Sequence, residues 1–419
     1  MSERPGAVGE DLPDLLYSDT ERALADSLSS LLADRSGLDK VLARTESAET
    51  YDDGLWHAVA VELGCAGLLI PERDGGGGAS YREAASAAEA LGSSVAPVPF
   101  LGSAVVATAA LLSVASASSP GTAAGAPRGA SSVSSGTPFT PARAATDLLR
   151  RMADGRVTAA LAAAFATAPG GEFPVSVRVA GPRPGDAQTG TARLRGTVSG
   201  VADALPASVL LVPADGVPHA LYLVDMSAPG VAKVPVVSLD MTRQLCDLSF
   251  DDAPGTLIAS GAAASQAVDA ALTAGAAILA AEQVGLAQRC LDMTLSYVKQ
   301  RHQFARPVGS FQALKHRLAD VWVAVSQARA ASRYAAACLA SGPGVHPDAK
   351  VATAMAKAYC SETAVLAAQE CMQMHGGIGF TWEHPAHLYL KRAKADSVAL
   401  GTPDAHRAAL ASLVNLPAP

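Results

Sequence analysis

The last third of the chain holds residues whose chemistry suits a phosphate-bearing ligand. Arg301 ends a long stretch of helical periodicity, and its guanidinium offers fixed donors to a phosphate group. Gly376 and Gly377 allow a backbone to approach a ligand closely, because neither residue has a Cβ atom. The residues alone leave a second interpretation open: a surface arginine at a helix end, and a glycine pair that ends a helix.

Long helices must position these residues. Apolar residues recur at helical spacing over residues 268–300, 311–340 and 349–375. A last helix is expected to begin near Thr402, because Pro403 suits a first helical turn. These stretches predict a C-terminal four-helix bundle.

The N-terminal part also has a helical pattern. Residues 20–32, 51–64 and 81–91 repeat apolar residues at helical spacing, and Gly92 is a plausible C-cap. The Ser-, Ala-, Gly- and Pro-rich residues 113–143 cannot bury enough surface to offset their ordering entropy. We expect that segment to be a mobile loop or linker.

The middle of the chain changes character. Residues 155–258 carry short Val- and Leu-rich runs divided by Gly, Pro and Asp, a pattern typical of a small all-β domain. Pro229, Gly230 and Pro235 are expected at turns between its strands. The predicted fold is therefore α+β with four segments: an N-terminal helical domain at 1–112, the insert at 113–143, a β-domain with its lead-in helix at 144–258, and the helical bundle at 259–419.

Composition excludes several classes of protein. The chain has 419 residues, a net charge of −7 and no long basic block, so nucleic acid is not an expected partner. No uninterrupted apolar run reaches the ~18 residues of a membrane span, and the polar N-terminus lacks the pattern of a secretory signal. The six cysteines form no C-x-x-C pair and are expected to be buried free thiols. From these features we expect a cytoplasmic protein without a metal site.

The order of segments, together with five motifs, resembles the acyl-CoA dehydrogenase family. The motifs are Leu69-Ile70-Pro71-Glu72 with Gly75-Gly76 and residues 89–92; Asp240-Met241-Thr242-Arg243; residues 281–288; Arg301-His302-Gln303-Phe304 with Phe311-Gln312 and residues 318–320; and residues 373–380 with Glu383 and Pro385. The resemblance covers most of the chain outside the insert.

The resemblance implies an acyl-CoA substrate, FAD as cofactor, and an oligomer in which these groups serve a flavin held mainly by the neighbouring subunit. A dimer or tetramer with a homologous subunit is expected, with electron-transfer flavoprotein among the candidate electron acceptors. Gln312 and Gln373 would donate to phosphate or adenine groups, or else contact another subunit. Phe304 would pack on the adenine or fill the core. The implied cofactor contacts are Arg301, Phe304, Gln312, Gln373, Gly376, Gly377 and Thr402.

The sequence departs from the family at the catalytic base. The family reaction removes an α-proton with a glutamate while a hydride leaves the β-carbon for the flavin. In many members that glutamate precedes Gly-Thr, where this chain has Leu400. Other members carry it on the helix before Ala281, where this chain has Gly275 followed by Ala276 in place of an arginine. Neither position accepts a proton.

Two aspartates are weak substitutes for the missing base. Asp396 precedes Leu400 by four residues and Asp404 follows it by four, so a continuous helix would place them on one face. The Gly-Thr break interrupts that helix before Asp404, and each aspartate is more simply a solvated or capping residue. In the β-domain, Gly200 and Ala202 stand where the family has an aromatic and a hydroxyl, so the wall beside the flavin ring is degraded.

Three functions remain open at this stage. The chain is the base-deficient partner in a hetero-oligomeric acyl-CoA dehydrogenase, where it completes the flavin site of a catalytic subunit. Alternatively, it is a homomeric FAD enzyme with a relocated base or altered chemistry in lipid, steroid or secondary metabolism. As a third hypothesis, it is a non-catalytic scaffold that binds no flavin.

Overall fold

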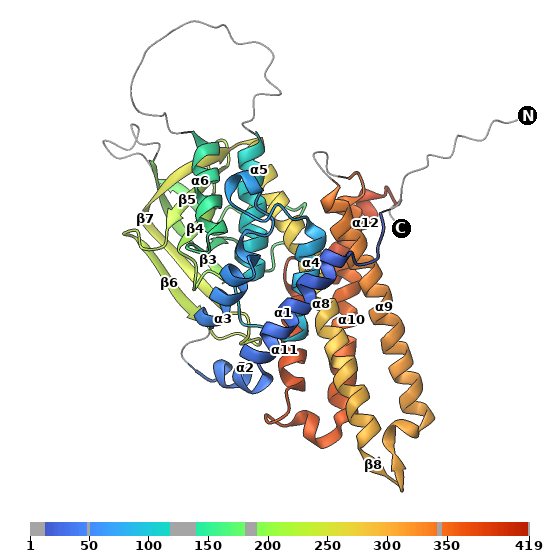
Figure 1. The fold of residues 1–419 in the computed structure, drawn as a ribbon. Helices are drawn as coiled ribbons and strands as arrows, with labels where there is room; N and C mark the ends of the chain where they lie inside the picture. Colours follow the sequence, from blue (N-terminus) through green and yellow to red (C-terminus); the bar gives the residue numbers. More distant parts are fainter. Residues whose placement is uncertain (1–12, 48–50, 118–139, 181–190, 342–345, 418–419) are drawn as a thin grey trace, which may run out of the picture.

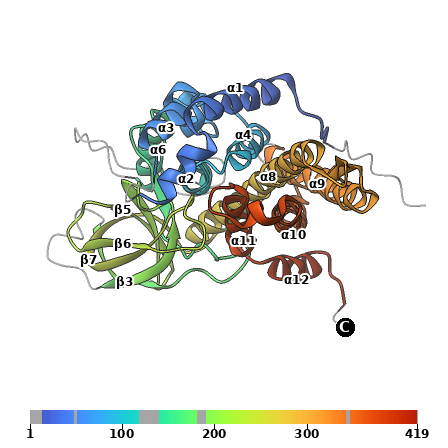
Figure 2. The same ribbon diagram turned by 90° about the horizontal axis from the view of Figure 1, so that it is seen from below.

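The computed structural model describes residues 13–47, 51–117, 140–180, 191–341 and 346–417. Three parts lie side by side: the N-terminal helices, a β-domain and a bundle of long C-terminal helices (Figure 1). Seen from below, the β-domain occupies one side and the bundle the other, and the N-terminal helices run along both (Figure 2). The predicted α+β fold, with helices on either side of a β-domain in the chain, is confirmed.

The N-terminal helices begin at well-formed caps. In α1, the Ser18 hydroxyl accepts from the Glu21 backbone while the Glu21 carboxylate accepts from the Ser18 backbone. Ser80 and Glu83 form the same capping box at α4, which satisfies N–H groups that a helix start otherwise leaves free. The helical elements are α1 Asp19–Arg35, α2 Leu38–Thr45, α3 Asp53–His57, α4 Tyr81–Ser93, the π-helices Ala58–Glu62 and Phe100–Ala107, α5 Thr108–Ala117 and α6 Pro141–Ala153.

Two expectations for this region need correction. Gly92 is not a C-cap, because it lies buried inside α4. A Cβ atom there would come within 2.2 Å of the Glu282 carbonyl oxygen, so the glycine allows α4 to pack closely on the C-terminal bundle. The expected insert is also shorter at both ends, since α5 continues to Ala117 and α6 begins at Pro141. Its central residues 118–139 lie outside the described part of the chain.

The β-domain is a twisted sheet in the order β1-β4-β5-β7-β3-β2, with β6 added beside β7. The β1–β4 pair is parallel and the other pairs are antiparallel. Pro235 lies within β6 opposite Cys246, so the prediction of a turn there was wrong. The strands are β1 Ala159–Leu161, β2 Val177–Ala180, β3 Thr191–Ala202, β4 Val209–Ala214, β5 Ala220–Asp225, β6 Val231–Val236 and β7 Leu245–Ser260.

The C-terminal bundle is built around α8, which is buried along most of its length. It packs against α4, α9 and α10, and α11 joins the same group while α12 covers α10. Gly285 allows the close contact with α4, because a Cβ atom there would come within 1.9 Å of the Glu89 carbonyl oxygen. The elements are α8 Ala262–Gln300, the hairpin strands β8 His302–Gln303 and β9 Arg306–Pro307, α9 Gln312–Ala340, α10 Ala349–His375, α11 Ala386–Val398 and α12 Pro403–Leu413.

In the part of the chain that the structure describes, two helices are long and apolar enough to cross a membrane by length and composition alone, Phe100–Ala117 and α8. Of their most apolar windows, 67% and 94% is buried inside the fold, which is the behaviour of core helices. All six cysteines are free and buried, as the sequence predicted.

Candidate active site and cofactor contacts

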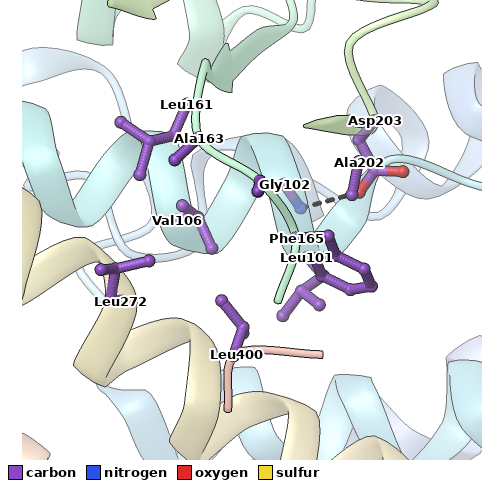
Figure 3. A pocket seen from close by; sticks show the side chains of 11 residues that line it. Leu101, Gly102, Val106, Leu161, Ala163, Phe165, Ala202, Asp203, Leu272 and Leu400 are labelled. Atoms are coloured by element: carbon purple, nitrogen blue, oxygen red, sulfur yellow. Dashed lines mark hydrogen bonds between the residues drawn. The ribbon is translucent and has the colours of Figure 1, made fainter. Parts of the chain in front are cut away.

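Leu400 lies against a small apolar cavity between the N-terminal helices, the β-domain and α8 (Figure 3). The cavity, called the inner cavity below, has a volume of about 30 Å³. Leu400 is 3% exposed and has a φ of 52°, and its N–H donates to the Phe165 carbonyl at 2.6 Å. The lining residues are Leu101, Gly102, Val106, Leu161, Ala163, Ala164, Phe165, Ala202, Asp203, Leu272 and Leu400.

The two positions at which the family resemblance implies a base, Leu400 and Gly275, lie against each other. A Cβ atom on Gly275 would come within 3.0 Å of Leu400 Cδ1 and 2.8 Å of Val106 Cγ2. The absence of a side chain at Gly275 therefore makes room for the leucine. Neither residue has an ionisable group, so the point where the positions meet is apolar.

Asp203 is the single carboxylate among the lining residues of the inner cavity. Its Oδ1 accepts a hydrogen bond from the Tyr51 hydroxyl at 2.7 Å and its Oδ2 accepts one from the Gly102 N–H at 2.9 Å. Figure 3 shows this carboxylate turned toward Gly102 and away from Leu400. Burial raises the pKa of Asp203, although nearby Arg243 opposes the change. The residue ties the β-domain to the N-terminal helices, a role that no local pattern in the sequence marks.

Asp396 and Asp404, the two weak substitutes for the base, lie in different environments. Asp396 is completely buried, so the expectation of a solvated or capping residue was wrong. Burial and the neighbouring Glu282 raise its pKa to about 7, with Arg243 acting in the opposite direction. It does not line the inner cavity. Asp404 lies in the first turn of α12, where its side chain is 94% exposed and pairs with Arg407.

Asp396 belongs to a buried group of charges, called the charge cluster below, that joins the β-domain to α8 and α11. Glu282 pairs with Arg243 and with Arg392, each at 2.5 Å. Arg392 also lies 2.6 Å from Asp240, and Arg243 donates to Asp396 at 3.0 Å. Although burial acts to raise the pKa of Glu282, the two arginines hold it below its ordinary value. A network of ion pairs of this kind gives each buried charge a partner of opposite sign.

A buried lysine supports the segment that carries Leu400. The Lys357 ammonium on α10 donates to the carbonyls of Asp396 and Gly401 at 2.9 and 3.3 Å and to the Ser361 hydroxyl at 2.9 Å. Burial lowers the pKa of Lys357 to about 8. Because the two carbonyls flank Leu400 in sequence, these hydrogen bonds fix the turn between α11 and α12.

A larger cavity, called the outer cavity below, lies on the other side of Phe165. Its volume is about 500 Å³, and most of its lining is apolar. The Arg243 guanidinium, 5.4 Å from the centroid of the Phe165 ring, contributes a cation to it. Residues from four segments line it: Ala164, Phe165 and Ala166 after β1, Ser199 and Gly200 of β3, Ser238, Leu239, Asp240, Arg243 and Leu245 before and at the start of β7, and Lys394, Ala395, Val398 and Ala399 at the end of α11.

Arg301, the expected phosphate-binding residue, lies far along α8 from Gly275 and the inner cavity. Arg301 directly follows α8 and lies 26 residues after Gly275. Along a helix with a rise of about 1.5 Å per residue, the two residues are roughly 39 Å apart. The β8–β9 hairpin beside it is at the lower end of the bundle in Figure 1. Phe304 in that hairpin is 86% exposed at a φ of 53°, so the expectation that it fills the core is excluded.

The remaining expected contacts fall into two places. Gln312 begins α9 and is exposed, and Gln373, Gly376 and Gly377 lie exposed at the end of α10. Cβ atoms added to either glycine would meet nothing within 4 Å. We call these four residues, with Arg301 and Phe304, the distal set. Thr402 lies apart from it, since its hydroxyl caps α12 by accepting from the Ala405 N–H at 3.2 Å.

Comparison with known proteins agrees with this architecture. The N-terminal domain of acyl-CoA dehydrogenases matches residues 18–119 and their C-terminal domain matches residues 265–414. The acyl-CoA dehydrogenase IpdE2 of Mycolicibacterium smegmatis is 31% identical over 92% of this chain and 96% of its own length. The chain therefore belongs to the acyl-CoA dehydrogenase family, a family of flavoprotein oxidoreductases.

Two solved structures are also similar. The ChsE4-ChsE5 complex from Mycobacterium tuberculosis matches with a TM-score of 0.78 and 25% identity, over 97% of this chain and all of the matched chain. The steroid acyl-CoA dehydrogenase variant of Tcur3481-Tcur3483 matches with a TM-score of 0.74 and 27% identity, over 94% and 97% of the two chains. Each of these descriptions joins two protein names, and the first calls the pair a complex.

Proposed function

We propose that this chain is the base-deficient subunit of a hetero-oligomeric acyl-CoA dehydrogenase. In that assembly it contributes the distal set to an FAD whose flavin ring is seated in a catalytic partner. The observation that carries the proposal is the pairing of Leu400 with Gly275: the two base positions meet, and an alkyl side chain fills the space. A carboxylate from another subunit must then remove the α-proton.

The fit of FAD to this chain differs between its two ends. The distal set offers an exposed guanidinium, two amides, an aromatic ring and an uncrowded glycine pair, which suits phosphate and adenine groups. At the other end, the side-chain donors of the outer cavity are Ser199, Ser238, Arg243 and Lys394, while Ala164, Ala166 and Gly200 bring none, and Phe165 lines both that cavity and the apolar space at Leu400. These features favour a site for acyl-CoA chemistry that a second chain completes.

Distance supports a site shared between subunits. Arg301 and Gly275 are separated by roughly 39 Å of one helix, which is too far for one dinucleotide to contact both ends. The distal set of one chain therefore serves a flavin ring held by another chain. The paired protein names of the two similar structures favour a homologous but different partner.

The homomeric alternative requires another base within this chain. Asp203 is the nearest candidate, and each of its oxygens already accepts a hydrogen bond that joins two domains. Its carboxylate also faces away from Leu400 (Figure 3). These contacts favour a structural role for Asp203 over proton abstraction.

The proposal is tested by expressing the chain alone and together with glutamate-bearing acyl-CoA dehydrogenase chains of its own organism. We expect the chain alone to purify without stoichiometric flavin and without acyl-CoA oxidation, and the correct pair to bind flavin and turn over. Arg301→Ala should lower the flavin content of the pair, whereas Arg22→Ala, an exposed arginine on α1, should not. Stoichiometric flavin with turnover in the chain alone would refute the partner-subunit role.

A further inference from the structure

Phe165 occupies the boundary between the two cavities. It lines both of them, together with its neighbour Ala164. Figure 3 shows its ring beside Leu101 at the edge of the inner cavity. The same side chain therefore borders both the outer cavity of about 500 Å³ and the small inner cavity at Leu400.

Three contacts hold Phe165 in this position. Its N–H donates to the Gly200 carbonyl of β3 at 2.9 Å, and its carbonyl accepts from the Leu400 N–H at 2.6 Å. Its ring lies 5.4 Å from the Arg243 guanidinium, a distance at which a cation is attracted to an aromatic face. Arg243 is itself fixed by Glu282 and Asp396 in the charge cluster. Phe165 is therefore anchored from the β-domain, from the end of α11 and from the cluster.

The inner cavity is too small for an acyl chain while Phe165 is in place. A volume of about 30 Å³ holds roughly two water molecules. The walls are nevertheless suited to an alkyl group, because Val106, Leu161 and Leu272 contribute apolar surface. The cavity thus has the chemistry of an acyl site without the space.

We infer that Phe165 is the gate that closes this subunit's own acyl site, so that the chain binds no acyl group beside Leu400. The inference deepens the proposed function and rests on it for the identity of the inner cavity as an acyl site. It names a specific residue, and it predicts that truncation of Phe165 alone admits a small apolar molecule. Leu400 fills the base position, and Phe165 blocks the way to it.

The test is benzene binding to the full chain, followed by the NMR shifts of isotope-labelled Leu and Val methyl groups. Val106, Leu161 and Leu272 line the inner cavity alone, while Leu245 and Val398 line the outer cavity alone. In the wild type we expect benzene to leave the inner-cavity methyls unshifted. In Phe165→Ala we expect saturable shifts at those methyls, because a dry apolar cavity of sufficient size binds benzene.

Phe173→Ala is the matched control, because Phe173 stacks on His219 at 4.8 Å and lines neither cavity. It should respond to benzene as the wild type does. If the alanine variant does not fold, the same measurement is made on Phe165→Val, which removes less of the side chain. Inner-cavity shifts of equal size in the wild type, or none in either Phe165 variant, would overturn the gate. Since benzene binding needs neither flavin nor partner, this result is independent of the co-expression experiment.

Discussion

Replacing Glu282 by glutamine should be among the most damaging single changes to this protein. Glu282 pairs with Arg243 and Arg392 at 2.5 Å, and all three side chains are at most 6% exposed. Its removal as an anion takes away the one carboxylate that contacts both buried guanidinium groups and leaves each with a single carboxylate partner, Asp240 for Arg392 and Asp396 for Arg243. Loss of one partner from a buried ion pair costs about 3–5 kcal/mol, a large share of a typical stability of about 5–15 kcal/mol.

An exposed ion pair of the same length supplies the control. Glu362 lies 2.5 Å from Arg407, but these side chains are 53% and 47% exposed. Water and salt screen such a pair, so Glu362→Gln should cost about 0–1 kcal/mol. The two variants therefore change the same functional group at the same distance and differ in burial.

Urea unfolding, followed by circular dichroism at low and high salt, measures both variants. We expect a clear fall in the unfolding midpoint for Glu282→Gln at either salt concentration and a small, salt-sensitive change for Glu362→Gln. The Glu282 variant should also loosen Arg243, which holds the Phe165 ring. If Glu282→Gln were no more destabilising than Glu362→Gln, the argument that this cluster fixes the β-domain against the bundle would fail.

Three further changes have predictable results. Gly285→Ala should cost about 1–3 kcal/mol in urea unfolding, because its Cβ would overlap a backbone oxygen of α4; Gly377→Ala, which meets nothing within 4 Å, should leave the midpoint unchanged. Gly275→Ala as a single change should lower the free energy of unfolding, and it should lower it less in a protein that already carries Leu400→Val. A double-mutant cycle of these two changes should give a coupling energy of about 0.5–3 kcal/mol. The folded-state pKa of Asp396, about 7, exceeds its ordinary value of about 4, so its ionisation lowers the unfolding free energy as pH rises from about 4 to 7. Asp396→Asn should remove that loss when urea midpoints at pH 5 and 8 are compared with the wild type, and equal pH dependence in both proteins would contradict the reasoning.

The long helices were predictable because their evidence is local. Helical periodicity over 349–375 corresponds to α10 Ala349–His375, and the predicted start near Thr402 is the observed cap of α12. The absence of an acid at Leu400 was also readable from sequence, since the motif position depends on neighbours in the chain. Local patterns of this kind carry information about element type.

The environment of Asp396 was not predictable in the same way. Its partner Arg243 is 153 residues away in sequence, and Glu282 is on a different helix. Helical periodicity gives the face on which a residue lies but not the element that covers that face. The position of Phe165 was not predictable for a related reason. It is a single aromatic residue in an alanine-rich stretch, and its contacts come from β3 and from the end of α11, which are distant in sequence.

The packing around Leu400 indicates repacking of the site rather than simple decay. A site that had only lost its functional groups would retain a void, at a cost of about 24 cal/mol for each Å³. The inner cavity of about 30 Å³ corresponds to roughly 0.7 kcal/mol on that scale, a small penalty. Leu400 fits against the hydrogen atom of Gly275, and Phe165 fills the approach, so each change complements another. Such mutual fit makes a well-packed junction between α8, the end of α11 and the segment after β1.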